Sequence, residues 1–244
     1  MLRDNGAGGS CSHGDIPHVQ NPEPIILSWS GGKDSALALA ALRDDPAFRV
    51  VALLTTITTG YDRISVHGVR RALLAAQERA IGLPVHEIVI EPQSSNAAYD
   101  AAVERALGDV RRRYPDVRRI AYGDLFLEDV RRYREERLAP LGFEGCFPLW
   151  GRPTAALARE FIERGFEARL VCVDTTQLKA AFAGRAFDAA LLDEMPPSVD
   201  PCGERGEFHT FVSAGPGFAE QVEYEVGEIV LRDGRFAFCD LVER

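Results

Sequence analysis

The sequence predicts an α/β protein with a doubly wound parallel five-stranded sheet and a smaller C-terminal α+β domain. From residue 25 to about 150, short apolar runs with β-branched residues alternate with amphipathic helical stretches. This alternation is typical of a parallel sheet whose two faces are both covered by helices. The last stretch, 221–242, instead alternates apolar and polar residues around Asp233-Gly234, which indicates an antiparallel β-hairpin.

Each element of the first sheet is expected from one such segment. The strands are expected at 25–30, 49–57, 85–90, 117–123 and 146–150. The helices between them are expected at about 33–43, 66–82, 96–113 and 127–140. Right-handed crossovers bring the carboxyl ends of parallel strands to one edge, so the loops at 30–35, 55–67 and 123–128 should surround one crevice.

Composition divides the chain into three segments. Residues 1–24 are rich in Gly, Ser, Asn, Pro and His and are interpreted as a disordered leader. Residues 25–150 are interpreted as the domain of the parallel sheet, and residues 151–244 as a C-terminal domain for the substrate or acceptor. The latter is expected to contain a helix at 154–164, a strand at 168–173, helical pieces up to Met195, and a segment rich in Pro and Gly at 196–216.

Charge and cysteine usage argue against several function classes. The chain has 244 residues, 46% of them hydrophobic, with a formal net charge of -9 and a pI near 5.1. This acidity makes nucleic acid or anionic lipid an unexpected partner. The five cysteines include no CxxC pair, which argues against a zinc cluster. The sequence shows no secretory signal and no apolar run of membrane-spanning length, so a cytoplasmic protein is expected.

The clearest chemical motif is the segment 28–35, Ser-Trp-Ser-Gly-Gly-Lys-Asp-Ser, between a buried strand and an Ala- and Leu-rich helix. Gly31 and Gly32 allow a tight turn and a close approach of the backbone to a ligand. The amides that follow, together with the helix N-terminus, can then face an anion. The segment therefore predicts a phosphate-binding loop.

Five side chains around this turn are candidates for the site: Ser28, Ser30, Lys33, Asp34 and Ser35. Lys33 adds a mobile positive charge, and the serine hydroxyls add hydrogen-bond donors. Asp34 is placed either to hold Mg²⁺ or to cap the helix. Lys33 and Asp34 are also candidate catalytic residues.

The spacing of the loop differs from the Walker motif, because the GxxxxGK[ST] pattern is missing and Lys33 is followed by Asp34. Ser-Gly-Gly-Lys-Asp-Ser resembles the PP-loop of the ATP pyrophosphatases. This resemblance implies that the loop grips the pyrophosphate portion of ATP and directs attack to the α-phosphorus. The alternative is an ordinary strand-to-helix turn in which the polar side chains only cap the helix.

Further segments extend the resemblance from Ile25 to about Phe218. They are His67-Gly68-Val69-Arg70, Tyr122-Gly123-Asp124 with Tyr133-Arg134-Glu135-Glu136, Pro148-Leu149-Trp150-Gly151, and the run Cys-Gly-Glu-Arg-Gly-Glu-Phe-His-Thr-Phe that begins at Cys202. Together with the loop they are similar to the diphthine–ammonia ligase family. This family belongs to the PP-loop, or adenine nucleotide alpha hydrolase, superfamily, which implies a HUP-like ATP-binding domain at 25–150.

The resemblance implies an ATP-dependent amidation. The acceptor carboxylate attacks the α-phosphorus, pyrophosphate leaves, and ammonia displaces AMP. ATP and ammonia are therefore expected as partners, and Mg²⁺ would offset the phosphate charge. Lys33 and the loop amides would stabilise the pyrophosphate leaving group.

Candidate nucleotide-binding residues also follow from other strand ends. Thr55 and Thr56 end the second strand, where the family places groups near the adenosine. Gly123 and Asp124 close the fourth strand and should face the same crevice, although Asp124 is equally suited to cap the next helix. His67 is either a ligand of the nucleotide or a helix cap.

Glu204, Glu207 and His209 are the candidate catalytic residues of the Gly-rich C-terminal segment. Carboxylates there could bind ammonium, orient the acceptor or take up a proton, whereas a structural turn is the alternative. Relatives acting on diphthine carry Gly-Glu-Gly-Gly-Glu-Tyr-Glu-Thr, so Arg205 and His209 here replace a glycine and an acid. The preference for arginine over lysine fits a bacterial-type member without diphthine. The acceptor carboxylate, on a protein side chain or a small metabolite, is therefore left open.

Two other functions remain as alternatives to the ligase. One is a PP-loop protein that modifies tRNA or transfers sulfur, which usually needs a basic face and paired cysteines. The other is a regulatory module that binds ATP without turnover. Arg131 and Arg134 are expected on a solvated helix face, and a homodimer is left open.

Overall fold

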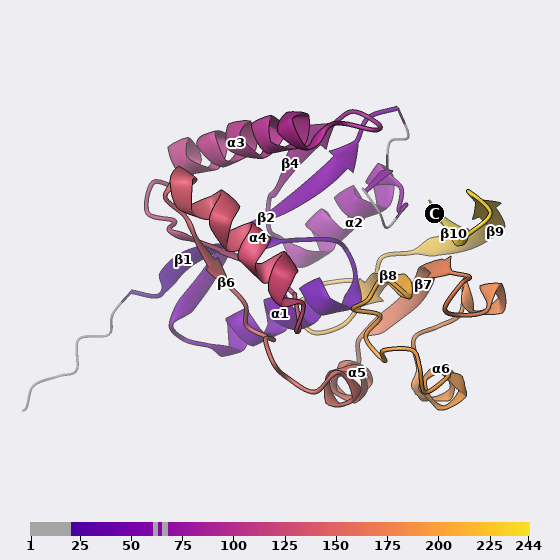
Figure 1. The fold of residues 1–244 in the computed structure, drawn as a ribbon. Helices are drawn as coiled ribbons and strands as arrows, with labels where there is room; N and C mark the ends of the chain where they lie inside the picture. Colours follow the sequence, from indigo (N-terminus) through magenta and orange to yellow (C-terminus); the bar gives the residue numbers. More distant parts are fainter. Residues whose placement is uncertain (1–20, 61–62, 65–67) are drawn as a thin grey trace, which may run out of the picture.

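The computed structural model describes residues 21–60, 63–64 and 68–244. The described chain forms two β-sheets, which lie side by side in Figure 1. The first sheet has six strands and comes from the N-terminal part, and the second has four strands and comes from the C-terminal part. The candidate ligand His67 lies outside the described residues.

The first sheet confirms the predicted doubly wound topology. Its parallel strands lie in the order β4 (Val85–Ile90), β2 (Phe48–Thr58), β1 (Glu23–Ser28), β5 (Arg119–Ala121) and β6 (Glu144–Cys146). The chain thus starts in the middle and adds strands first on one side and then on the other. The short β3 (Arg63–Ile64), which was not predicted, pairs antiparallel with the end of β2.

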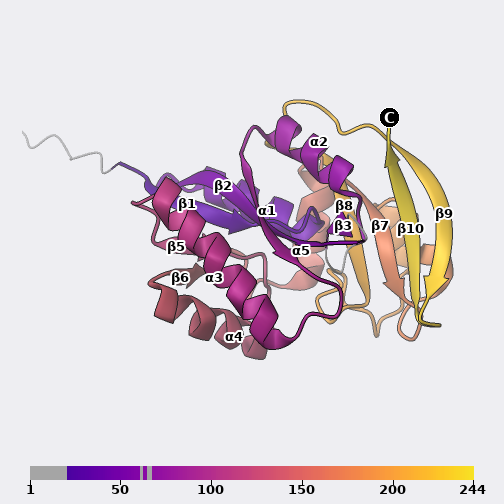
Figure 2. The ribbon, with the colours of Figure 1, turned by 90° about the horizontal axis from the view of Figure 1, so that it is seen from above.

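Helices cover both faces of this sheet, as Figure 2 shows from above. Helices α1 (Lys33–Asp44) and α2 (Arg71–Ile81) share one apolar core with Ile25 and Leu27 of β1. Helix α3 (Asn96–Arg113) and the end of α4 (Glu128–Leu138) share the opposite core with Ile26. Because successive strand residues point to opposite faces, the uninterrupted apolar run of β1 serves both cores.

Several predicted boundaries were wrong. The strand predicted at 146–150 ends at Cys146, and the chain then turns through Pro148, whose nitrogen has no hydrogen to donate to a ladder. The strand predicted at 117–123 pairs only over Arg119–Ala121, which leaves Gly123 beyond the sheet. β1 begins at Glu23, so the last two residues assigned to the leader belong to the strand.

The second sheet is antiparallel, in the order β8 (Phe208–Ala214), β7 (Glu167–Asp174), β10 (Phe236–Glu243) and β9 (Tyr224–Arg232). Strands β9 and β10 form the predicted hairpin. Asp233 and Gly234 have φ angles of 51° and 62°, the left-handed conformation of the two central residues of a type I′ turn, and the Arg235 N–H closes this turn by donating to the Arg232 carbonyl. Strand β8 was missed, because its segment was read only as rich in Pro and Gly.

Short helices complete the described chain. They are α5 (Thr154–Glu163), α6 (Ala189–Glu194) and the 3₁₀ turns η1 (Ala139–Leu141) and η2 (Ala180–Phe182). Among the described helices, none has the length and apolar character needed to cross a membrane.

The two sheets are joined at the turn that follows β1. One apolar cluster contains Leu27 and Trp29 from the first sheet's side and Phe211 from β8. The Val212 N–H of β8 donates to the Gly31 carbonyl at 2.9 Å, and the Lys33 N–H donates to the Thr210 hydroxyl at 3.0 Å. The predicted phosphate loop is therefore held between the two sheets.

Candidate functional site

A cavity of about 250 Å³ lies where the carboxyl ends of β1 and β5 meet the segment 202–210. Each of these three places contributes predicted site residues to its lining: Ser28, Ser30, Gly32, Lys33, Asp34, Ser35, Gly123, Asp124, Glu204 and His209. Their convergence follows from the topology, because parallel strands end at one edge and β8 brings the last segment there. Gly31 and Glu207 do not line it.

The glycine turn shapes one wall of the cavity. Gly31 has a φ of 77°, and an added Cβ would approach the Gln77 Oε1 to 2.8 Å. Only glycine suits this position, since the conformation is left-handed and the neighbour is close. The Gly31 carbonyl accepts hydrogen bonds from Val212 and Gln77, neither of which lines the cavity. The turn thereby directs Gly32 and the first turn of α1 towards the cavity.

The start of α1 suits an anion. Gly32 is the N-cap residue and supplies no side chain to satisfy the amides of the first turn. The Ser30 hydroxyl accepts from the Gly32 N–H at 3.3 Å, and the Ser35 hydroxyl donates to the Gly32 carbonyl at 2.8 Å. These contacts fix both hydroxyls beside a helix N-terminus, where backbone amides and the helix dipole favour negative charge.

Lys33 is buried, with 2% of its surface exposed. Its Nζ lies 2.8 Å from an oxygen of Asp34 and also donates to the Cys202 carbonyl. Burial by itself would lower the pKa of Lys33, but the Asp34 carboxylate beside it holds that pKa above its usual value. Lys33 is therefore a charged group that connects the phosphate loop to the C-terminal segment.

Gly123 forms the opposite wall by close packing. A Cβ at this position would lie 2.8 Å from the Asp34 carbonyl carbon and 2.9 Å from its oxygen. The end of β5 can approach the start of α1 only because residue 123 has no side chain. Asp124 follows it into the cavity wall and accepts hydrogen bonds from Arg134, at 2.9 Å for the Nη2 contact.

Arg134 was predicted to lie on a solvated helix face, and this prediction was wrong. It lines the cavity, pairs with Asp124, and lies 4.2 Å above the Tyr122 ring. Burial raises the pKa of Tyr122 to about 12, so that ring remains a neutral platform. Arg131 is also partly buried, 4.8 Å from the ring centroids of Phe147 and Trp150.

Glu204 is an acid in the cavity whose proton affinity is raised. Burial raises its pKa to about 7, although its Oε1 accepts a hydrogen bond from the Leu125 N–H at 2.8 Å. Neighbouring Asp34 and Asp124 act in the same direction. A carboxyl group with this pKa is able both to take up and to release a proton near neutrality.

Glu207 occupies a different environment. It is 1% exposed, and its two oxygens accept the N–H groups of Asp200 and Arg205, both at 2.9 Å. Asp200 in turn accepts from the Cys202 N–H at 2.9 Å and from the Thr154 hydroxyl at 2.7 Å. Through these hydrogen bonds, the two buried carboxylates stabilise the segment that contains Glu204.

The remaining candidate site residues differ in their burial and in whether they line the cavity. His209 was expected in a loop but is in strand β8, partly buried on the cavity wall. Thr55 and Thr56 lie in β2 and do not line the cavity. Thr55 is buried, and its hydroxyl has no hydrogen-bond partner among the described residues.

Sequence reasoning missed Gln77, whose side chain is fully buried in α2. Its Oε1 accepts from the Trp29 indole N–H at 2.9 Å, and its Nε2 donates to the carbonyls of Gly31 and Val212. A polar residue on the apolar face of a predicted helix was the available signal. Thr210, whose hydroxyl accepts a hydrogen bond from the Lys33 N–H, gave no such signal.

Cys202 lines the cavity with its thiol buried. Burial raises the pKa of this thiol to about 12, and the thiol donates to the Thr154 carbonyl at 3.4 Å. It therefore stays protonated, unlike the thiolate that sulfur chemistry requires. Among the residues that the structure describes, no three His, Cys, Asp or Glu are arranged to hold a metal ion by themselves.

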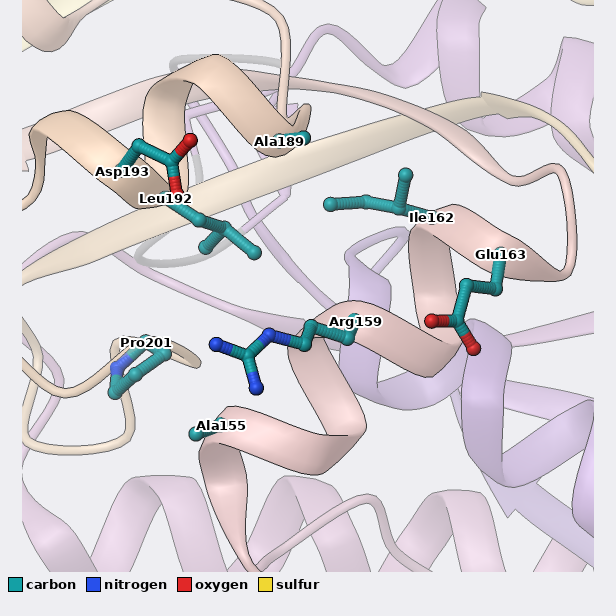
Figure 3. Close-up of a pocket in the computed structure, with 8 residues that line it drawn as sticks. All are labelled: Ala155, Arg159, Ile162, Glu163, Ala189, Leu192, Asp193 and Pro201. Atoms are coloured by element: carbon teal, nitrogen blue, oxygen red, sulfur yellow. The ribbon is translucent and has the colours of Figure 1, made fainter.

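A second cavity, of about 310 Å³, lies between α5 and α6 and is shown in Figure 3. Ile162 and Leu192 line it together with Pro201, and the Arg159 side chain points into it. None of the predicted site residues lines this cavity. Of these two cavities, only the first is therefore lined by predicted site residues.

Comparison with protein families adds an independent finding. A family model described as the diphthamide synthase N-terminal domain matches residues 24–142. A second model, described as the diphthamide synthase C-terminal domain, matches residues 153–241. The two matches cover most of the chain and include the phosphate loop and the segment of Glu204. A comparison with curated proteins finds no match.

Proposed function

Because this chain belongs to the diphthamide synthase family, whose members are ATP-using ligases of the PP-loop type, we propose that it activates a carboxylate for amidation. ATP is cleaved to AMP and pyrophosphate. The acceptor carboxylate attacks the α-phosphorus, and ammonia then displaces AMP from the activated acyl group.

One observation carries this proposal: a single cavity combines a helix start that suits an anion with a carboxyl group of raised pKa. The loop residues 30–35 provide amides, hydroxyls and the charge of Lys33 for a pyrophosphate group. Preorganised donors of this kind stabilise charge that develops on a leaving group. Arg134 supplies a second cation on the opposite wall.

The oxygen donors of the cavity fit Mg²⁺. Asp34 offers a carboxylate, and the hydroxyls of Ser30 and Ser35, 3.3 Å from each other, belong to residues that line the same cavity. Mg²⁺ commonly binds through one or two carboxylates together with substrate phosphates, so a complete protein cage is unnecessary. When bound, the ion would offset phosphate charge.

Glu204 is proposed to accept a proton from ammonium, the nitrogen source. Ammonium must lose a proton before its nitrogen can attack, and a carboxylate with a pKa of about 7 is suited to receive it. Glu207, which is bonded to two backbone amides, is proposed to position the segment. His209 and Arg205 flank it and are proposed to contribute to acceptor choice.

The remaining parts of the proposal concern partners and location. The acceptor is a carboxylate on a protein side chain or a small metabolite, and diphthine is one candidate among them. A cytoplasmic location is supported by the four described cysteines, which are all free thiols. A homodimer is also proposed.

The reaction class is tested by product analysis. We expect protein incubated with ATP and Mg²⁺ to form AMP and pyrophosphate, at a rate stimulated by ammonium and a suitable carboxylate. Formation of ADP and phosphate would contradict the proposal. Stoichiometric binding of intact ATP that no acceptor converts would favour the regulatory module, and specific retention of tRNA would favour a modifying enzyme.

A further inference from the structure

Strand β9 is the outermost strand of the second sheet and lies at the edge of the molecule in Figure 2. It pairs with β10 on one side, and no described strand covers its other side. The free side of a strand presents a row of backbone donors and acceptors to another strand. β9 is nine residues long, and its pairing with β10 is regular on both sides of an irregularity between Val226 and Ile229.

The hairpin also exposes unusual apolar surface. Among the described residues, five of the seven exposed large hydrophobic side chains belong to β9 and β10: Val226, Ile229, Val230, Leu231 and Val242. Leu231 is 57% exposed and Ile229 is 53% exposed. Edge strands are usually protected by proline, charged side chains or β-bulges. β9 contains no proline or lysine, and the irregularity in its pairing with β10 lies between Val226 and Ile229, so residues 229–232 form a regular and largely apolar edge. An exposed apolar segment of this kind is typical of a surface that acquires a partner.

We propose that the chain forms a two-fold symmetric homodimer in which β9 of one protomer pairs antiparallel with β9 of its partner. The two four-stranded sheets then become one continuous sheet. Such an interface is isologous, since both protomers contribute the same surface. The proposal is independent of the chemistry assigned to the cavity.

The charge pattern of β9 selects the register. With the two-fold axis at Val230, Glu228 lies opposite the partner's Arg232, and Ile229 lies opposite the partner's Leu231. With the axis at Glu228, more residues would pair, but Glu228 would lie opposite the partner's Glu228. Opposite charges across a strand pair are favourable and like charges are not, so the first register is preferred.

Both charged residues are available for this pairing. Glu228 and Arg232 are exposed, and neither forms an ion pair with another residue in the part of the chain that the structure describes. In the same hairpin, Glu225 pairs instead with Arg244. The apolar pairs supply buried area, while the two symmetry-related ion pairs fix the register.

A charge-exchange series tests the dimer by sedimentation velocity over a wide concentration range. We expect the wild-type protein to be a dimer, and Glu228→Arg or Arg232→Glu to weaken it roughly tenfold or more, because each creates two like-charge contacts. The double variant reverses both ion pairs and should restore the dissociation constant to within a few-fold. A monomeric wild type, or a double variant as weak as the single ones, would overturn the proposal.

A second pair of variants tests the apolar contact. Leu231→Lys should produce monomers, because it places a charge opposite the partner's Ile229. Val89→Lys is the matched control, since Val89 is similarly exposed at 48% but lies on β4 of the other sheet. Circular dichroism verifies that both variants are folded. Equal dimerisation of the two variants would contradict the proposed surface.

Discussion

Lys33 is the residue on which the charge balance of the cavity depends. It is buried, pairs with Asp34 and donates to the Cys202 carbonyl. A buried ammonium is tolerated only where such partners compensate for its lost hydration. The same side chain therefore links the loop to the C-terminal segment and places a positive charge at the cavity.

Lys33→Ala should lower AMP formation roughly a hundredfold or more, because loss of a preorganised donor at developing charge costs about 3–4 kcal/mol. The measurement is the steady-state rate of AMP release at saturating ATP. Lys179→Ala is the matched control, since Lys179 is the other lysine of the chain and is exposed. A rate unchanged by Lys33→Ala, in a protein that remains folded, would remove Lys33 from the proposed chemistry.

Glu204→Gln should abolish the part of the pH–rate profile that belongs to this carboxyl group. With a pKa of about 7, Glu204 gains its basic form as pH rises, so the wild-type rate with ammonium should increase through neutrality. The glutamine variant should lose this rise. Glu220→Gln, at an exposed position, should retain the wild-type profile.

The same substitution changes the pH dependence of stability. The folded-state pKa of Glu204 lies above the ordinary value of 4.5, so the folded protein binds more protons between these two values. Its contribution to stability is therefore fully present below the unfolded pKa and is lost as pH rises through about 7. Thermal unfolding of Glu204→Gln should lack this decline.

At the scale of elements, the site depends on how closely strand ends approach a helix start. Gly123 permits the end of β5 to contact the backbone of α1 at Asp34. The cavity wall is therefore formed by backbone packing as well as by side chains. A change at this contact should affect the nucleotide site more than an equal change within a helix.

Gly123→Ala should weaken ATP binding at least tenfold and lower the melting temperature, because its Cβ would overlap backbone atoms of Asp34. Calorimetric titration and thermal unfolding measure the two effects. Gly108→Ala is the control, since Gly108 lies inside α3 and the nearest atom to an added Cβ is 3.8 Å away. That variant should gain about 0.5–1 kcal/mol of stability. Equal behaviour of the two alanines would contradict the packing argument.

At the scale of the whole molecule, Gln77 connects the two sheets. One amide side chain joins Trp29 and the Gly31 turn to the Val212 carbonyl of β8. The phosphate loop and the C-terminal sheet are therefore stabilised by the same buried group. Separation of the two sheets would leave these polar atoms without their partners.

Gln77→Leu should lower the free energy of unfolding by about 2–3 kcal/mol, because it leaves buried donors and acceptors unsatisfied at nearly constant volume. Urea unfolding measures this change, and a raised KM for ATP would accompany it. Gln221→Leu changes an exposed glutamine and should have little effect on either quantity. A Gln77 variant with wild-type stability would show that the two sheets do not depend on this connection.

The local sequence pattern was sufficient to predict much of the fold. Apolar strands alternating with helices predicted the parallel sheet, because burial on both faces requires uninterrupted apolar strands. Asp233-Gly234 predicted the hairpin, because its two residues adopt left-handed conformations at low cost. The two glycines before Lys33 predicted a tight strand-to-helix turn, which the structure has because Gly31 adopts a left-handed conformation. That this turn binds phosphate stays a prediction.

Only the tertiary structure decided which residues that are far apart in the sequence contact each other. Arg134 was predicted on a solvated face, yet it lines the cavity because Asp124 and the Tyr122 ring lie beside it. Glu204 and Glu207 are close in sequence, but only folding exposes one to the cavity and bonds the other to backbone amides. Proton affinity and partner choice depend on burial and on distances across the fold, which a linear pattern does not contain.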